Sequence, residues 1–238
     1  MPSVDANLEG SADKLSRFDF GAVADTYDQW YETAEGAMYD RLEKKAVSRY
    51  LRQNTQGKKL LEVGCGTGHW SRFFSDCGFE VTGVDVSERM IKIAQSKNIQ
   101  NGSFQVADGH SLPFKDNSFD VTAAITTLEF VYDAELVLQE MARCTHKPSG
   151  QLLIGVLNLL AKLNRNRQEN SVSLYAKARL FSPDQLKTLL SKYGKIQLFT
   201  VGFIPRWKRL LPLSPFIDAI GRLFHLKHGV FIASQVRL

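Results

Sequence analysis

The sequence predicts an α/β fold built on a parallel, doubly wound sheet. Two observations lead to this prediction. From residue 57 onward, short apolar segments typical of buried strands alternate with amphipathic segments of helical period. One strand segment, residues 150–158 (GQLLIGVLN), is so apolar that it should lie mid-sheet, covered on both faces. Ligands of such sheets collect outside the carboxyl ends of the strands, so functional residues are expected there.

Each element is placed by its own local pattern. We expect strands at residues 58–63, 79–86, 103–107, 117–125, 150–158, 195–203 and 229–236. We expect helices between them at residues 69–77, 87–97, 133–144 and 182–193. Ser87, Asp133 and Ser182 stand where an N-cap belongs, and Pro183 occupies the favoured first helical position.

Three parts of the chain lie outside this alternation. Residues 1–14 are polar and without periodicity, whereas apolar spacings of three and four over residues 18–53 predict two helices broken around Gly36. We therefore expect a tail and helical region over 1–56 and one domain over 57–238. Two inserted segments, near 159–180 and 205–228, interrupt that domain.

The composition narrows the class of protein. A net charge of +5 and a pI of about 9.1 suit an anionic partner, yet the sequence has no Lys/Arg-dense tract with interleaved aromatics, so nucleic acid is disfavoured. The three cysteines form no disulfide framework or metal-binding pattern, so no metal is expected and a cytoplasmic location is favoured. The first twenty residues hold four carboxylates and no apolar core of a secretory signal.

The glycine loop after the first strand, EVGCGTG at residues 62–68, is typical of a nucleotide-like ligand. A phosphate-binding loop would end in Gly-Lys-Ser/Thr, but His69 and Trp70 follow Gly68. A dinucleotide fingerprint would need glycine at position 69, where it packs helix against strand over a pyrophosphate. The third glycine stands one residue earlier, so binding of NAD or FAD is also disfavoured.

This loop, together with Asp85 seventeen positions after Gly68 and the segment VADGHSLPF around Asp108, resembles the class I S-adenosylmethionine (AdoMet) methyltransferases. The agreement covers residues 59–158. YDQWYET and RCTHKPSGQLLIGVLN look like the small-molecule group with the ubiquinone and menaquinone C-methyltransferases (methyltransferase type 11). The resemblance implies a Rossmann-like, mostly parallel seven-stranded sheet with an antiparallel last strand and an N-terminal helical lid.

The resemblance also implies a cofactor site for AdoMet, with S-adenosylhomocysteine as the product. Glu62 would orient the methionine ammonium, Asp85 would accept from both ribose hydroxyls and Asp108 from the adenine amino group. The polar pair Thr126 and Thr127, which ends the strand over 117–125, should lie close to the methyl group. The expected cofactor-binding residues are Tyr27, Trp30, Glu62, Gly64, Cys65, Gly66, Gly68, Asp85, Val86, Asp108, Gly109 and Thr126.

The implied reaction is in-line methyl transfer to a small-molecule, lipophilic acceptor. The residues of the catalytic step stay unassigned: His69, Glu129, Tyr31 and His110 are candidate bases by position only. An RNA methyltransferase and a non-catalytic AdoMet-binding module remain alternatives, and the sequence leaves the oligomeric state open. The basic amphipathic segment 205–228 would either contact an anionic membrane or cap its own domain.

Overall fold

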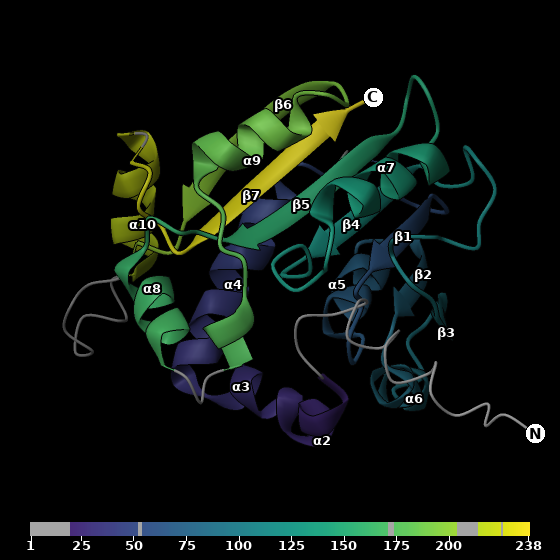
Figure 1. The fold of residues 1–238 in the computed structure, drawn as a ribbon, viewed down its shortest axis with the longest axis horizontal. Coiled ribbons are helices and arrows are strands. Elements are labelled where there is room, and N and C mark those ends of the chain that lie inside the picture. The colour runs from purple at the N-terminus through teal and green to yellow at the C-terminus, as the bar shows by residue number, and fades with distance from the viewer. Residues whose placement is uncertain (1–19, 52–53, 171–173, 204–213, 225) are drawn as a thin grey trace, which may run out of the picture.

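Seven strands form a single sheet in the order β3-β2-β1-β4-β5-β7-β6 (Figure 1). The structure is a computed structural model that describes residues 20–51, 54–170, 174–203, 214–224 and 226–238. Strands β3 to β5 pair in parallel, and β7 runs antiparallel to both β5 and β6. The predicted fold class is confirmed. The strands are β1 Lys59–Val63, β2 Glu80–Asp85, β3 Gly102–Val106, β4 Val121–Ile125, β5 Gln151–Leu157, β6 Lys195–Val201 and β7 Phe231–Arg237.

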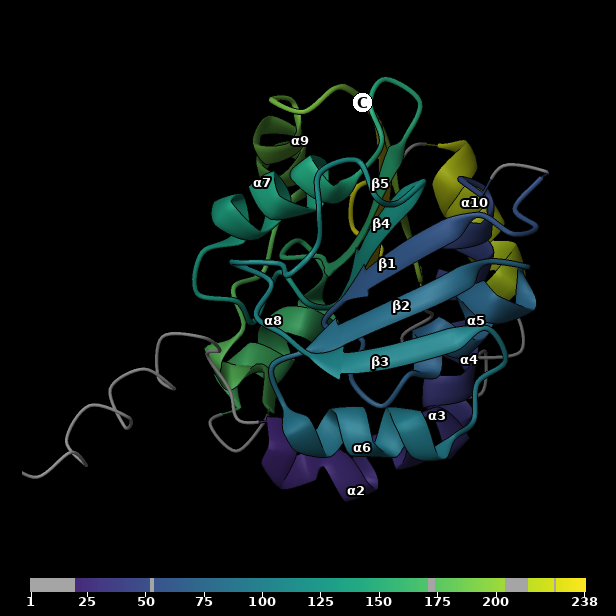
Figure 2. The same ribbon diagram turned by 90° about the vertical axis from the view of Figure 1, so that its right-hand side faces the viewer.

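Helices cover both faces of the sheet (Figure 2). On one face, α7 and α9 pack on a buried hydrophobic cluster that includes Met141, Leu152 and Leu186. On the other face, α4 and α5 pack on a second cluster that includes Tyr39, Phe74 and Phe231. All seven residues of β5 are buried, as predicted. The helices are η2 Phe20–Val23, α2 Ala24–Tyr27, α3 Gln29–Glu32, α4 Ala34–Ser48, α5 His69–Asp76, α6 Glu88–Ser96, α7 Ala134–Cys144, α8 Lys162–Glu169, η3 Leu174–Lys177, α9 Pro183–Leu190 and α10 Ser214–Leu223.

The predicted helix starts are confirmed by side-chain caps. Ser87 accepts from the backbone N–H of Met90, and Asp133 accepts from those of Glu135 and Leu136. At α9, Ser182 and Gln185 form a reciprocal capping box ahead of the rest of the helix.

The predicted helix break at Gly36 is wrong by three residues. The chain turns at Thr33, whose extended backbone ends α3 and whose side chain accepts from the Gly36 N–H to start α4. Gly36 lies inside the first turn of α4, where a Cβ would stand 1.9 Å from the Trp30 carbonyl oxygen. Only glycine fits this position without a shift of the backbone. The glycine therefore permits close packing of α3 on α4 rather than breaking a helix.

Two segments outside the alternation carry helices of their own. α8 and η3 lie between β5 and α9, and α10 lies between β6 and β7. Part of the predicted basic amphipathic segment 205–228 lies outside the described residues, including its basic and apolar residues Arg206, Trp207, Lys208, Arg209, Leu210 and Leu211. None of the described helices has the length and apolar character needed to cross a bilayer.

Candidate functional site

The glycine loop leaves β1 with backbone angles that favour glycine. Gly64, Gly66 and Gly68 have φ values of 72°, 52° and 80°. A Cβ on Gly64 would lie 2.3 Å from the Thr127 side chain, whereas a Cβ on Gly66 would meet nothing within 4 Å. Gly66 lines an open pocket, so its backbone is accessible to a ligand.

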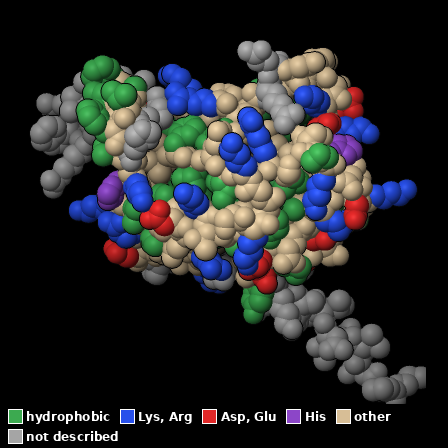
Figure 3. All heavy atoms as spheres, turned by 90° about the horizontal axis from the view of Figure 1, so that it is seen from above, with side chains coloured by type: hydrophobic (Ala, Val, Ile, Leu, Met, Phe, Trp, Pro, Cys, Tyr) green, Lys and Arg blue, Asp and Glu red, His purple; other side chains and the backbone are tan. Residues whose placement is uncertain are grey.

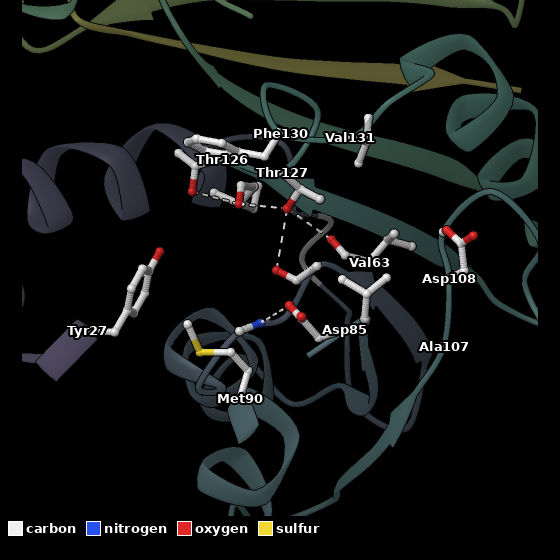
Figure 4. A pocket seen from close by; sticks show the side chains of 15 residues that line it. Tyr27, Val63, Asp85, Met90, Ala107, Asp108, Thr126, Thr127, Phe130 and Val131 are labelled. Atoms are coloured by element: carbon white, nitrogen blue, oxygen red, sulfur yellow. Dashed lines mark hydrogen bonds between the residues drawn. The ribbon is translucent and has the colours of Figure 1, made fainter. Parts of the chain in front are cut away.

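Asp85 ends β2 directly opposite this loop. Its Oδ2 accepts from the Gly66 N–H at 3.0 Å and its Oδ1 from the Ser87 N–H at 2.9 Å, which fixes the plane of the carboxyl group (Figure 4). Burial raises the pKa of Asp85, and these backbone hydrogen bonds oppose the rise. Because a carboxylate oxygen can accept more than one hydrogen bond, both oxygens remain able to bind a ligand's hydroxyl groups.

Asp108 follows β3 and is held by His110. Asp108 Oδ1 accepts from the His110 N–H at 2.9 Å and lies 2.6 Å from His110 Nδ1. His110 Nε2 accepts from the Asp133 N–H at 3.1 Å, so in a neutral ring the proton sits on Nδ1. His110 therefore orients Asp108 and holds the start of α7. The hydrogen bonds to Asp108 within the described residues all end on Oδ1, which leaves Oδ2 for a ligand.

A first pocket opens at the carboxyl ends of β1, β2 and β4. Its empty volume is about 660 Å³, open solvent at the mouth included. Figure 4 shows Tyr27 at one end, Asp108 at the other and Asp85 between them. Eight residues expected from the sequence line it: Tyr27, Gly64, Gly66, Asp85, Val86, Asp108, Gly109 and Thr126.

The other four expected cofactor residues lie elsewhere. Glu62 is 2% exposed below the loop, where it accepts from the Ser71 hydroxyl and where burial raises its pKa to about 8. Cys65 is buried and its thiol pKa lies well above the usual range. Gly68 is the N-cap of α5, and Trp30 lines a second pocket. A cofactor contact by these four residues stays a prediction.

Thr127, the second member of the expected polar pair, also lines the first pocket, and its hydroxyl donates to the Val63 carbonyl at 3.1 Å, which ties the ends of β4 and β1 together. Other residues of this lining were not expected from the sequence. Met90 projects into the pocket from α6, and Phe130 and Val131 do so from the loop after β4. Their apolar character alone does not distinguish them from core residues in the sequence.

A second pocket adjoins the first, and Tyr27 and Thr126 line both. Its empty volume is about 1020 Å³, open solvent included. Aromatic side chains from α2, α3, α4, α5 and η3 form much of its wall, and Glu43 and Arg167 are among its charged residues. Burial raises the pKa of Glu43 to about 8, with Asp40 as the next contribution. The aromatic members are Tyr27, Trp30, Tyr31, Tyr39, Trp70 and Tyr175.

Of the candidate bases, Tyr31 lines the second pocket, whereas His69 does not line it and packs against the Tyr31 ring. The two rings stack at 3.6 Å between centroids with an angle of 4°. His69 Nε2 lies 2.7 Å from Asp40 Oδ1 and 2.9 Å from Lys44 Nζ, so this ring nitrogen already has protein partners.

Glu129, the remaining candidate base, has a structural position. It is fully buried, its Oε1 accepts from the Leu157 N–H at 2.6 Å, and burial raises its pKa to about 8. This bond fixes the carboxyl end of β5 beside the pockets. Among the described residues, no group of three or more His, Cys, Asp or Glu side chains is arranged to hold a metal ion.

Comparison with known proteins identifies the chain. A family model described as a methyltransferase domain matches residues 61–154. A demethylmenaquinone methyltransferase of Thermotoga maritima is 32% identical over 160 residues, which cover 66% of this chain and 67% of that protein. The chain spans 80%, 52% and 62% of the lengths of three curated relatives with strong matches.

Solved structures share the fold at lower identity. An S-adenosylmethionine-dependent methyltransferase from Thermotoga maritima has a TM-score of 0.71 at 24% identity, covering 92% of this chain and 97% of its own. Phosphoethanolamine N-methyltransferase 2 of Haemonchus contortus, solved with S-adenosylmethionine, has a TM-score of 0.60 at 16% identity and covers 90% of this chain and 59% of its own. The chain belongs to the class I S-adenosylmethionine-dependent methyltransferases.

Proposed function

We propose that the protein methylates a small-molecule acceptor, with AdoMet in the first pocket and the acceptor in the second. The observation that carries this proposal is the shared wall: Tyr27 and Thr126 line both pockets, so occupants of the two would meet there. When bound, AdoMet supplies a methyl group whose bond to positively charged sulfur breaks as the acceptor bonds to its carbon, leaving a neutral thioether. The acceptor's proton, where it has one, passes to a base or to water.

The residues of the first pocket fit this cofactor. Gly66 presents bare backbone, as close approach of an amino-acid tail requires. Asp85 has two oxygens for the two adjacent hydroxyls of a ribose, and Asp108 has a free oxygen for an exocyclic amine. Orienting two reactants in this way contributes up to about 7–11 kcal/mol to lowering a barrier in ideal cases.

The name of the T. maritima relative supports a small, ring-containing acceptor. The second pocket agrees with this because aromatic rings line much of its wall. Thr126 and Thr127, which follow β4 directly, line the first pocket where it adjoins the second.

A coupled assay for S-adenosylhomocysteine formation tests the proposal. We expect turnover with members of a panel of aromatic and quinol-type metabolites and none with transfer RNA. Turnover with RNA alone would favour the RNA methyltransferase. Tight S-adenosylhomocysteine binding by calorimetry without turnover of any acceptor would favour the non-catalytic module.

The N-terminal helices are proposed to act as a lid over both pockets. Asp28, between α2 and α3, accepts from the Thr67 hydroxyl of the glycine loop at 2.6 Å and pairs with Lys97 at 2.5 Å. Tyr27, next to it, lines both pockets. Deleting residues 1–35 should weaken S-adenosylmethionine binding measured by calorimetry, and an unchanged affinity would reject the lid.

Peripheral contact with an anionic membrane is proposed for the side of the molecule that carries α10. Phe216, Leu223 and Phe224 are 68%, 74% and 68% exposed, and Figure 3 shows hydrophobic side chains gathered there. Lys227 follows within the same segment. Such a surface suits delivery of a lipophilic acceptor. The protein should co-sediment with phosphatidylglycerol vesicles, and the bound fraction should fall with added salt and in the variant Phe224→Ser. Binding to neutral vesicles but not to anionic ones would contradict the proposed contact with an anionic membrane.

A cytoplasmic location is part of the same proposal. Cys65, Cys77 and Cys144 are all unpaired, as expected of a reducing compartment. Cell fractionation with thiol labelling would test it, and recovery of the protein in an oxidising compartment would contradict it.

A further inference from the structure

The second pocket holds an arginine whose hydrogen-bonding capacity the described part of the protein does not use. The guanidinium carbon of Arg167 lies 5.1 Å from the ring centre of Trp30, 5.7 Å from that of Tyr39 and 5.5 Å from that of Tyr175. Its ion-pair partner Glu35 stands 4.0 Å away, which is beyond hydrogen-bond distance. The side chain is only 21% exposed, so five N–H donors are largely withdrawn from water.

Two further polar groups of this pocket have unused capacity. The Asn164 amide donates to the carbonyls of Asn158 at 2.9 Å and Val230 at 2.7 Å, while its Oδ1 is buried without a partner in the described structure. The carboxyl group of Glu43 forms no hydrogen bond with the described residues, and its pKa of about 8 keeps it protonated at neutral pH. Unpaired polar groups that are largely buried are costly unless a ligand or water completes their hydrogen bonds.

The charged groups of the second pocket place the positive charge of Arg167 on its lining. Asp40 is the other carboxylate of the wall, and Lys44 at 2.9 Å and His69 at 2.7 Å already pair with it. With Glu43 protonated, Arg167 is the charged group of the described lining without a hydrogen-bonded counter-ion, since Glu35 stands 4.0 Å away and outside the lining. A cationic acceptor would be repelled from this charge, and an anionic one attracted.

We infer that the second pocket selects a planar, conjugated methyl acceptor that carries a carboxylate, and that Arg167 is the specificity residue that binds this carboxylate. The fixed fork of a guanidinium matches the two oxygens of a carboxylate, and the three rings around Arg167 hold the fork in place. Asn164 Oδ1 and Glu43 then meet a hydroxyl or amino substituent elsewhere on the acceptor. The inference rests on the proposed function, because it takes the second pocket as the acceptor site.

Three para-substituted phenols of similar size test the inference by calorimetry on the full chain saturated with S-adenosylhomocysteine. They are 4-hydroxybenzoate, 4-hydroxybenzamide and tyramine, which are anionic, neutral and cationic. We expect 4-hydroxybenzoate to bind roughly 10- to 100-fold more tightly than the amide, since hydrogen bonds to charged groups are among the stronger ones. Tyramine should bind more weakly than either.

Variants on one helix supply the control. Arg167→Gln should remove the preference for the carboxylate, and Arg167→Lys should keep part of it because it keeps the charge without the fork. Lys162→Gln, at an exposed position of α8, removes a positive charge from the same helix and should leave the preference unchanged. Thermal unfolding of each variant shows that it is folded.

The outcomes separate this inference from the proposed function. If 4-hydroxybenzoate binds no more tightly than the amide, or if its preference survives Arg167→Gln, the inference is overturned. In that case normal S-adenosylhomocysteine binding leaves the cofactor site intact. If S-adenosylhomocysteine itself does not bind to the unaltered protein, the proposed function fails first.

Discussion

The backbone N–H of Gly66 donates to Oδ2 of Asp85 across 3.0 Å, so the glycine loop and the end of β2 are joined at the pocket itself. Asp85→Asn should lower S-adenosylhomocysteine affinity by roughly 10- to 100-fold, because one acceptor oxygen becomes a donor and the charge is lost. Asp120→Asn is a matched control, since Asp120 also accepts a backbone N–H, that of Lys59, at the opposite end of β1. Equal losses in both variants, measured by calorimetry, would contradict a role for Asp85 in ligand binding.

Gly66 should be needed for a ligand to approach the backbone of the first pocket rather than for folding. Gly66→Ala and Gly57→Ala place a Cβ at φ values of 52° and 70°, and in both cases nothing lies within 4 Å. Both should cost about 1–2 kcal/mol of unfolding free energy in urea titration, the usual penalty of left-handed backbone. Only Gly66→Ala should also abolish S-adenosylhomocysteine binding, because its methyl group enters the first pocket. Normal affinity in Gly66→Ala would show that no ligand approaches this backbone.

The lid should be held closed by Asp28. Asp28→Ala removes the bonds to Thr67 and Lys97, so S-adenosylhomocysteine should dissociate faster in stopped-flow displacement, by roughly tenfold. Asp25→Ala removes only the exposed pair with Arg89 and should change the rate little. An unchanged dissociation rate in Asp28→Ala would mean that the N-terminal helices do not gate the pocket.

Stability should fall as pH rises from about 5 to 8. Glu43, Glu62 and Glu129 have folded-state pKa values of about 8, against 4.5 for an unperturbed glutamate. Between these values the folded chain holds protons that the unfolded chain has released, so the free energy of unfolding decreases with pH over this window and levels off above 8. Each pKa unit corresponds to about 1.4 kcal/mol. Urea titrations at pH 5.5, 7 and 8.5 would measure the slope.

Glu129→Gln isolates one of these groups. A glutamine carbonyl can still accept from the Leu157 N–H but does not titrate, so the variant should gain stability relative to the unaltered protein as pH rises. The same pH slope in both proteins would show that Glu129 is already ionised in the folded state.

The strand and helix pattern of the sheet could be predicted because each element carries a local signal. The caps at Ser87, Asp133 and Ser182 and the apolar run of β5 depend on neighbours in sequence. Gly36 misled the prediction because its reason, the approach of the Trp30 carbonyl, is a contact between two helices. A glycine in the sequence alone does not show whether it ends a helix or allows two helices to pack closely.

The first pocket was more predictable than the second for a similar reason. The first pocket is assembled from strand ends, where Asp85 and Asp108 stand at spacings that the sheet imposes. The second is assembled from helices far apart in the chain: Glu43 comes from α4 and Arg167 from α8. Neither residue stands in a motif, so only the packing of α4, α8 and η3 brings them to one cavity.

The position of β7 between β5 and β6 has a consequence for the order of folding during synthesis. β6 pairs with β7 and not with β5, so it has no place in the sheet until β7 is made. While residues 158–230 are synthesised, one edge of the wholly buried strand β5 therefore lacks its partner. A nascent chain of this protein would therefore present unpaired backbone N–H and C=O groups along β5 until β6 and β7 join the sheet, and such edges favour aggregation.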